Sequence, residues 1–500
     1  MTSVPSAPES PVTAVPRHAR LLDAAAAIAL ALGIMALLSG GIRLRYGSVS
    51  LSILSPWRPL LLAMGLAAIR LALFRRVTPI ERLRHRCHAW RHDPAVGEAW
   101  RAMLAIRLPI LVAAFFAVLI IGYPPGHEPS ARAVRNELVN LPFRWDAGWY
   151  LGIAIDGYDY DPATHGQQNI AFFPAYPMLM RTAAGLLGAR SPLAPGSVNL
   201  VELDQRLNGR TMLGGWVVSL AASAWALIYL FRFARDTLGW QAAKGSVWLL
   251  SAFPFAYFFG ALYTEGLYLL GVVGAIYHFR RHEDLPASLW GLLVGLTRPN
   301  GCLLSVPLGI MALQQAFLPR TLAAGDPSPR PGWMSFTRAL VVAAMPGLGM
   351  VAFSAWLWTL TSQPLAWMQA HAAWGRTFHG VEAMPLDSLA AIGNLGVYGY
   401  VRAQPIEALY LLAMVGSLAV TWPVGRRLGF GYAVLILITI LPPFFAGGFL
   451  SMGRITSTLF PVFVYLGWRL SPAATPRVVM SWMALQGMLA AAFFTWRDVY

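Results

Sequence analysis

The sequence predicts an all-α polytopic membrane protein, a bundle of about 13 transmembrane helices, and three observations predict it. Of the 500 residues, 57% are hydrophobic and only 12% are charged, whereas soluble domains carry roughly 25% charged residues. Apolar runs long enough to cross a bilayer recur along the whole chain. The arginines behind the net charge of +16 lie in short loops between these runs, as the positive-inside rule expects. This distribution argues against a nucleic-acid partner.

The predicted elements begin with a Pro/Ser/Ala-rich tail over residues 1–20, which is expected to be disordered. Two transmembrane helices and a basic cytoplasmic loop follow over 21–106, then the main membrane domain over 107–470 and a C-terminal transmembrane helix over 471–500. The individual spans are expected at about 21–40, 58–75, 107–123, 211–231, 245–259, 262–279, 286–297, 302–317, 338–360, 405–422, 429–447, 455–470 and 478–495.

The arginine distribution predicts the orientation of these spans. The basic stretch 75–107 is expected in the cytoplasm, so the third span leads out and residues 124–210 form an outer loop. The absence of an N-x-S/T sequon fits a bacterial cell (inner) membrane. Later basic positions then fall on the inner side: Arg232, Arg235 and Lys244; Arg280 and Arg281; Arg320 and Arg330; Arg426 and Arg427; Arg469 and Arg477.

This orientation requires that the apolar stretch 171–188 does not cross the membrane. Pro174 and Pro177 interrupt it, so we expect a re-entrant or interfacial segment. The alternative is a true span, which would reverse the orientation of every later element.

The stretch FRWDAGWYLGIAIDGY follows the third span and places an acid among aromatic and aliphatic residues. On a helix, Trp145, Trp149 and Ile153 form an apolar stripe, and Asp146 and Tyr150 form the neighbouring row. Such a helix is expected to lie in the membrane–water interface on the side facing away from the cytoplasm, with tryptophan as its anchor. A helix cap or an ion pair with the preceding arginine would explain Asp146 structurally, and a general base would explain it functionally.

Further polar residues interrupt apolar runs on the same predicted side. Glu265, Arg298 with Asn300, and Arg454 all face outward in the predicted topology. Each alone could snorkel or form a structural ion pair, but charges at such depth usually line a cavity. Arginine binds phosphate through a bidentate fork. A carboxylate with converging arginines therefore indicates a general base beside a phosphate leaving group.

Metal-ligand patterns are weak. Asp156, Asp159 and Asp161 could offer oxygen ligands to a hard cation, but their spacing matches no EF-hand, and a solvated loop is the favoured alternative. His371 and His379 lack a partner carboxylate nearby, and the aromatic residues around them are typical of an interfacial belt. We therefore expect neither a metal nor another cofactor.

Several of these stretches, taken in order, resemble the PIG-V-like mannosyltransferase family. This is the family of the second mannosyltransferase of GPI-anchor assembly and its bacterial relatives. The matching stretches are RWDAGWY, DGY, NIAFFPAYPMLMR, FPFAYFFGALYTE, GLTRPNG and SMGR…FP, between about residues 140 and 465. Pro299 departs from the pattern, because a small polar residue is expected there. The two N-terminal spans are an appendage found in some bacterial versions.

The resemblance implies a GT-C-type glycosyltransferase bundle, with 107–470 as its catalytic membrane domain. It implies a polyprenyl-phosphate-linked sugar donor, a lipid or glycan acceptor among membrane lipids, and transfer of mannose on the extracytoplasmic face with inversion. Asp146 is the expected general base. The expected substrate-binding residues are Arg144, Trp145, Trp149, Tyr150, Glu265, Arg298, Asn300 and Arg454.

Two other function classes fit part of the sequence. A transporter or flippase of lipid-linked sugars would need polar residues throughout the bundle, often in two inverted halves. The charges instead gather on one side, and the distinctive stretches do not repeat. A membrane scaffold without activity gives no reason for an acid and three outward charges to share one leaflet.

Overall fold

The computed structural model describes residues 16–39, 42–46, 49–53, 55, 57–74, 84, 88–126, 132–164, 166–189, 200–317, 333–377 and 383–499. By internal contacts the chain divides into two compact units, residues 1–97 and 98–500. The sequence analysis placed a boundary at 106/107, and its domain division stays a prediction. The predicted tail over 1–20 lies almost wholly outside the described residues, as do Arg320, Arg330 and His379.

The first unit is built on two apolar helices that contact each other, α1 (Arg17–Ser39) and α2 (Trp57–Leu73). They correspond to the expected spans at 21–40 and 58–75. An antiparallel hairpin joins them, formed by β1 (Ile42–Tyr46) and β2 (Val49–Ile53). The sequence analysis did not predict this hairpin. The Arg70 guanidinium, buried against the helix pair, forms an ion pair with Asp23 at 3.0 Å.

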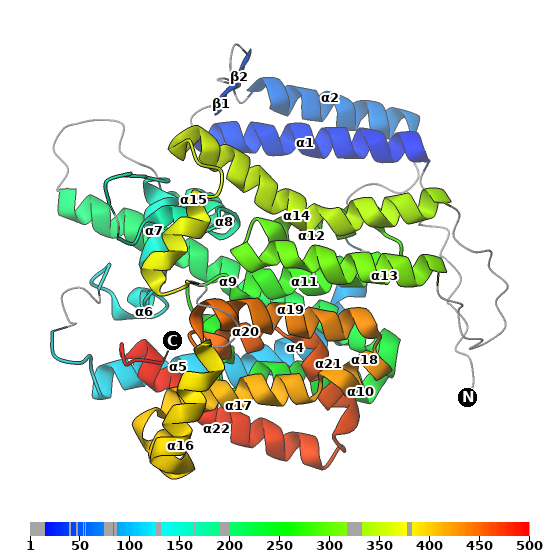
Figure 1. Cartoon of the computed structure of the whole chain (residues 1–500). Helices are drawn as coiled ribbons and strands as arrows, with labels where there is room; N and C mark the ends of the chain where they lie inside the picture. The colour runs from blue at the N-terminus through cyan, green and yellow to red at the C-terminus, as the bar shows by residue number, and fades with distance from the viewer. Residues whose placement is uncertain are drawn as a thin grey trace. The chain divides into compact units, whose positions relative to one another are not determined.

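The rest of the chain is helical throughout its described residues (Figure 1). Most of these elements are α-helices; η1 is a π-helical turn, and η2 to η5 are 3₁₀ helices. In chain order the elements are α4 (Pro94–Ala102), η1 (Met103–Arg107), α5 (Leu108–Ile120), α6 (Glu137–Asn140), α7 (Ala147–Ile155), η2 (Asn169–Ala171), α8 (Ala175–Leu186), α9 (Leu200–Leu238), α10 (Trp240–Ala252), η3 (Ala256–Gly260), α11 (Glu265–Arg280), α12 (Asp284–Gly295), η4 (Pro299–Leu304), α13 (Ser305–Phe317), α14 (Trp333–Thr361), α15 (Ala366–Ala370), η5 (His371–Trp374), α16 (Ala383–Ala403), α17 (Pro405–Ala419), α18 (Thr421–Arg427), α19 (Phe430–Gly447), α20 (Met452–Thr456), α21 (Phe460–Arg469) and α22 (Ala474–Phe494).

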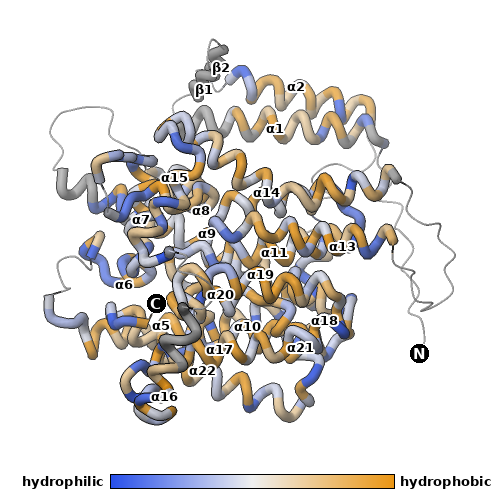
Figure 2. The backbone as a smooth tube through the Cα atoms, viewed as in Figure 1, coloured by the Kyte–Doolittle hydropathy of each residue, from blue (hydrophilic) through white to orange (hydrophobic). Residues whose placement is uncertain are grey.

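Six helices of the described part are long and apolar enough to cross a membrane, which makes the protein an integral, multi-pass membrane protein. They are Pro94–Ile120, Gln205–Leu238, Met334–Thr361, Pro405–Arg427, Phe430–Gly447 and Ala474–Phe494. The other expected spans correspond to shorter apolar helices such as α10, α11, α12, α13 and α21, so the count of about 13 stays a prediction. Figure 2 shows hydrophobic residues along the helices and hydrophilic residues mainly in the connections, including those around α6 and α7.

The first of these six spans starts earlier than the sequence analysis expected. Helices α4, η1 and α5 run on continuously, so the span covers Pro94–Ile120 rather than 107–123. Arg107 therefore lies in the middle of a span, beneath the Phe259 ring at 5.8 Å. Arg101 and Arg107, expected in the basic cytoplasmic stretch 75–107, both lie within this helix.

The stretch 171–188 forms only a short helix. Helix α8 has 12 residues, about 18 Å at 1.5 Å per residue, which is well short of the ~30 Å hydrocarbon core. Its length supports the prediction that this stretch does not cross the membrane.

Helices α10 and α11 form the buried centre of the second unit, because most of their residues are buried, those of α10 from Gly245 onward nearly all. Helix α10 packs directly on α21 through paired glycines: a Cβ on Gly467 would lie 2.5 Å from the Ser246 backbone nitrogen. This close approach fixes α10 and α21 side by side. The segments that follow α10 and precede α21 then meet at one end of the pair, where Glu265 and Arg454 lie.

Candidate active site

Asp146 lies at the turn before α7, with its backbone held in place. Trp145 adopts a left-handed φ of 52°, which is uncommon for a residue with a side chain. The Asp146 backbone N–H donates to the Tyr263 hydroxyl at 3.2 Å. Its carboxylate makes no capping bond to α7. Instead Oδ2 accepts from Arg454 Nη1 at 2.8 Å, so neither the predicted cap nor the predicted ion pair with Arg144 explains this residue.

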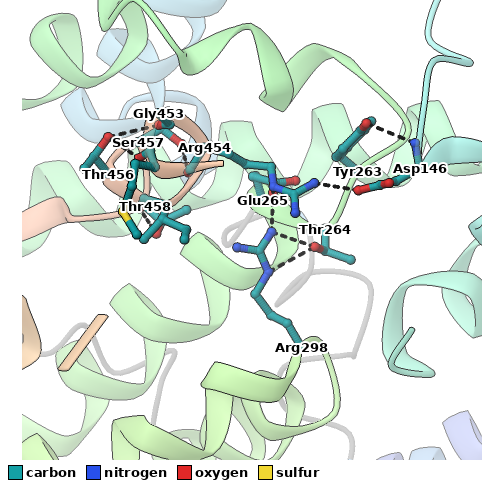
Figure 3. A network of polar contacts seen from close by, with 12 residues as sticks. Asp146, Tyr263, Thr264, Glu265, Arg298, Gly453, Arg454, Thr456, Ser457 and Thr458 are labelled. Carbon is teal, nitrogen blue, oxygen red and sulfur yellow. Dashed lines mark hydrogen bonds and ion pairs between the residues drawn. The ribbon is translucent and has the colours of Figure 1, made fainter. Parts of the chain in front are cut away.

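Arg454 connects Asp146 to a second carboxylate. Its Nε lies 3.2 Å from Glu265 Oε1, and the same Glu265 oxygen pairs with Arg298. Arg298 also donates from Nε and Nη2 to the Thr264 hydroxyl, at 3.1 and 2.8 Å. Figure 3 shows Arg454 between the two carboxylates and Arg298 reaching up to Glu265 from a separate segment. We call Asp146, Glu265, Arg298 and Arg454 the charged network.

The sequence around Arg298 explains its position. The residue is extended, with φ −162° and ψ 159°, and Pro299 opens the 3₁₀ turn η4, where a fixed φ suits the first helical position. A Cβ on Gly301 would lie 2.1 Å from the Val294 carbonyl oxygen. Helix α12 has already ended at Gly295, and Pro299, which departs from the family pattern, starts η4 directly after the extended Arg298, whose side chain reaches Glu265.

Two of the network arginines line a cavity with a volume of ≈ 380 Å³. Arg298 and Arg454 lie on its wall together with Asn300, and Arg376 contributes a third guanidinium. The remaining walls come from η4, α15, η5, α19 and α20, with Cys302, Trp367, Met368, His371, Pro442 and Pro443 among them. An anion in this cavity would face three arginines.

The sequence analysis missed Arg376. It lies in the connection after η5, where Nη2 reaches the Leu450 carbonyl oxygen at 3.5 Å, and it forms no ion pair within the described part of the chain. Burial lowers the pKa of Arg376 to about 10, and nearby Arg454 adds to the effect. A half-buried guanidinium on a cavity wall, without an ion pair among the described residues, favours an anionic ligand. Its signal in the sequence was a single arginine in the aromatic stretch WMQAHAAWGRTFHG.

His371 lies on the same cavity wall, and its contacts indicate which ring nitrogen carries the proton. Its Nδ1 lies 2.7 Å from the Trp367 carbonyl oxygen, so Nδ1 carries a proton and donates it. Burial lowers the pKa of His371 below its usual value, which keeps the ring neutral at pH 7. The sequence analysis expected no metal at this histidine, and the described residues contain no group of three His, Cys, Asp or Glu side chains able to hold an ion.

An aromatic cluster holds the Asp146 helix. Trp149 stacks on Phe172 with ring centroids 5.7 Å apart, and Trp374 meets both rings edge-on at 5.6 and 5.5 Å. Tyr150 packs edge-on against Tyr176 at 5.2 Å and is buried. Trp149 and Tyr150, predicted as substrate-binding residues, thus anchor α7, and Trp149 keeps part of its surface exposed.

Two other predicted binding residues have structural contacts instead. The Arg144 side chain is fully buried and donates to the carbonyl oxygens of Phe494 at 2.6 Å and Asn140 at 2.7 Å, and to the Tyr123 hydroxyl at 3.0 Å. Trp145 packs on Trp496 with centroids 4.9 Å apart. Both residues tie the turn before α7 to the C-terminal end of α22.

The acidic run after α7 behaves as a surface loop. The Asp161 carboxylate accepts from the Ala163 backbone at 2.9 Å and from the Thr164 hydroxyl at 2.7 Å. These local bonds lower the pKa of Asp161, Thr164 contributing most. Asp156 ends α7. The favoured prediction of a solvated loop is consistent with this geometry.

Comparison with protein families confirms the resemblance drawn from the sequence. Residues 124–358 match the family described as "Mannosyltransferase (PIG-V)". The matched segment contains Asp146, Glu265 and Arg298, and ends before Arg376 and Arg454. No curated protein matches the chain.

Two solved structures are similar, both of the Archaeoglobus fulgidus oligosaccharyltransferase. One, in complex with Zn and sulfate, is 14% identical with a TM-score of 0.35, over 78% of this chain and 53% of that one. The other, tethered to an acceptor peptide containing the NVT sequon, is 13% identical with a TM-score of 0.38, over 78% and 55%. This chain spans about half the length of those chains, and the likeness is too distant to carry an argument.

Proposed function

Because residues 124–358 match a family of mannosyltransferases, we propose that this membrane protein is a glycosyltransferase that moves mannose from a polyprenyl-phosphate donor to an acceptor hydroxyl. The observation that carries the proposal is the charged network, two of whose arginines, Arg298 and Arg454, line the cavity. It combines a carboxylate with one exposed edge, Asp146, and arginines that suit a phosphate.

In the proposed reaction Asp146 acts as general base. Within the described residues its carboxylate contacts only Arg454, through Oδ2, so Oδ1 is left to accept a proton. The side chain is 20% exposed, which gives an acceptor access. The acceptor hydroxyl loses its proton to Asp146 as its oxygen attacks the anomeric carbon. The bond from that carbon to the phosphate oxygen breaks, and the sugar configuration inverts through an oxocarbenium-like transition state.

The leaving polyprenyl phosphate departs as an anion and needs no general acid. We assign its binding to the cavity that Arg298, Arg376 and Arg454 line, where three guanidinium groups would stabilise the charge that develops. Glu265 holds two of these arginines in position, and Asn300 is placed to contact phosphate or sugar. The prenyl chain would remain in the bilayer and hold the donor at the interface. The proposed site faces away from the cytoplasm.

The test of the base is Asp146→Asn, which keeps the size of the side chain and an acceptor for Arg454. Transfer from labelled polyprenyl-phosphomannose to a membrane acceptor should fall by about 10²-fold or more, with donor binding largely kept. Asp156→Asn, at the other end of α7, is the matched control and should retain activity. Full activity of Asp146→Asn would remove this residue as base, and binding without transfer by the unaltered protein would favour a transporter.

A further inference from the structure

A second cavity lies at the opposite end of the bundle from the charged network. It has a volume of ≈ 580 Å³, and its walls come from the first turns of α10 and α22. Helix α10 starts here at Trp240 and leads towards Glu265. Helix α22 starts here and ends at Phe494, whose carbonyl binds Arg144 beside the candidate active site. The two cavities therefore lie near opposite ends of α10 and α22.

The chemistry of this cavity is amphipathic. Lys244, the only lysine of the chain, is exposed on its wall. Around it lie apolar side chains, with Trp240 51% and Met480 61% exposed at the rim. Val479 and Pro476 add to the apolar wall from α22. Tryptophan and lysine at a helix end are typical of the level of lipid headgroups.

The local charge favours an anion. Helix α10 begins at this cavity without a side-chain cap, so its first turn adds partial positive charge beside Lys244. No carboxylate lines the cavity among the described residues. Glu98, the acid behind the wall, is already bound to the Trp248 indole at 2.7 Å and to Arg101 at 2.7 Å.

We propose that this cavity binds an anionic phospholipid, with its phosphate at Lys244 and the start of α10 and an acyl chain along the apolar wall. The volume lies in the range of small-molecule sites, roughly 300–1,000 Å³. One ammonium in an apolar setting suits a lipid, because a free anion would gain no second side-chain cation there and would lose its hydration. The lipid would wedge between α10 and α22, both of which lead to the candidate active site.

The single lysine makes the test specific. The full-length protein is placed in nanodiscs of phosphatidylglycerol or of phosphatidylcholine, and amines are acylated and mapped by peptide mass. Only Lys244 and the N-terminal amine can react. Acylation of Lys244 should be about fivefold slower in phosphatidylglycerol. The Arg426→Lys variant supplies an exposed amine at another helix end as an internal control, and the amine at position 426 should be slowed much less.

Two further arms separate the outcomes. Thr475→Trp fills the cavity while keeping Lys244, and should remove the protection; native mass spectrometry should also find less phosphatidylglycerol retained by Lys244→Gln. A thermal unfolding scan checks that both variants fold. Equal slowing of acylation at positions 244 and 426 would overturn the proposal, because it would indicate a general effect of the membrane surface. Protection of Lys244 by inorganic phosphate in phosphatidylcholine nanodiscs would also overturn it, because it would indicate a site for a soluble anion.

Discussion

At the scale of single residues, Glu265 is the centre of the charged network. It is fully buried and pairs with Arg298 and Arg454. Glu265→Gln would leave these two guanidinium groups with less compensation, and breaking a buried pair costs about 3–5 kcal/mol. We expect a matching loss of unfolding free energy in mild detergent, together with loss of transfer. Glu283→Gln, at a carboxylate 40% exposed, should cost less than about 1 kcal/mol; equal costs would contradict a central role.

Arg376 gives a prediction about donor binding. Arg376→Gln should raise KM for the polyprenyl-phosphate donor at least about tenfold, because a hydrogen bond to a charged group is lost, and should change kcat much less. In the unaltered protein kcat/KM for donor should fall as the pH approaches about 10, where Arg376 begins to lose its proton. Arg101→Gln, at a side chain 64% exposed, is the control. An unchanged KM would remove Arg376 from the donor site.

The site residues could be predicted from the sequence where their charge interrupts an apolar run. Glu265, Arg298 and Arg454 interrupt apolar runs, and the structure brings all three together with Asp146. Arg376 lies in the connection after η5, where its charge interrupts no apolar run. Arg144 shows the reverse, because a residue next to Asp146 in sequence points into structural contacts. Proximity to Asp146 in the sequence therefore did not predict the direction of the Arg144 side chain.

At the scale of helices, close packing of α10 on α21 sets the position of the site. A Cβ on Gly467 would lie 2.5 Å from Ser246 N and 2.7 Å from the Ala242 carbonyl oxygen. Gly467→Ala should therefore cost about 1–3 kcal/mol by overpacking and reduce transfer as Arg454 shifts. Gly309→Ala, where no atom lies within 4 Å, should be neutral or stabilising, by up to ~1 kcal/mol. Thermal unfolding of the two variants distinguishes these signs.

The helices themselves were predicted better than their ends. Apolar runs located most of the longer helices of the second unit, because burial in lipid or in the bundle demands apolar residues in either case, but they did not predict α16. It could not separate a full span from a shorter buried helix such as α12, since both are apolar. It also placed the start of the first long span at 107 instead of Pro94, because Glu98 and Arg101 form an ion pair inside the helix.

At the scale of the whole molecule, the charged network joins segments whose contact could not be predicted from the sequence. Asp146 and Arg454 are 308 residues apart, and only the packing of α10, α11 and α21 brings them into contact. The match to the mannosyltransferase family ends at residue 358. The arginines contributed by the C-terminal part thus complete a site whose acids come from the matched segment.

The side of the membrane on which this site lies is the prediction that concerns the molecule as a whole. In a chain with Cys87 and Cys302 replaced by serine, Ala163→Cys marks the exposed loop after α7, and Arg426→Cys marks the end of α18. A membrane-impermeant maleimide added to intact cells should label position 163 and leave position 426 unlabelled until the cells are permeabilised. The reverse pattern would place Asp146 in the cytoplasm, out of reach of a donor presented on the outer face, and the proposed reaction would fail with it.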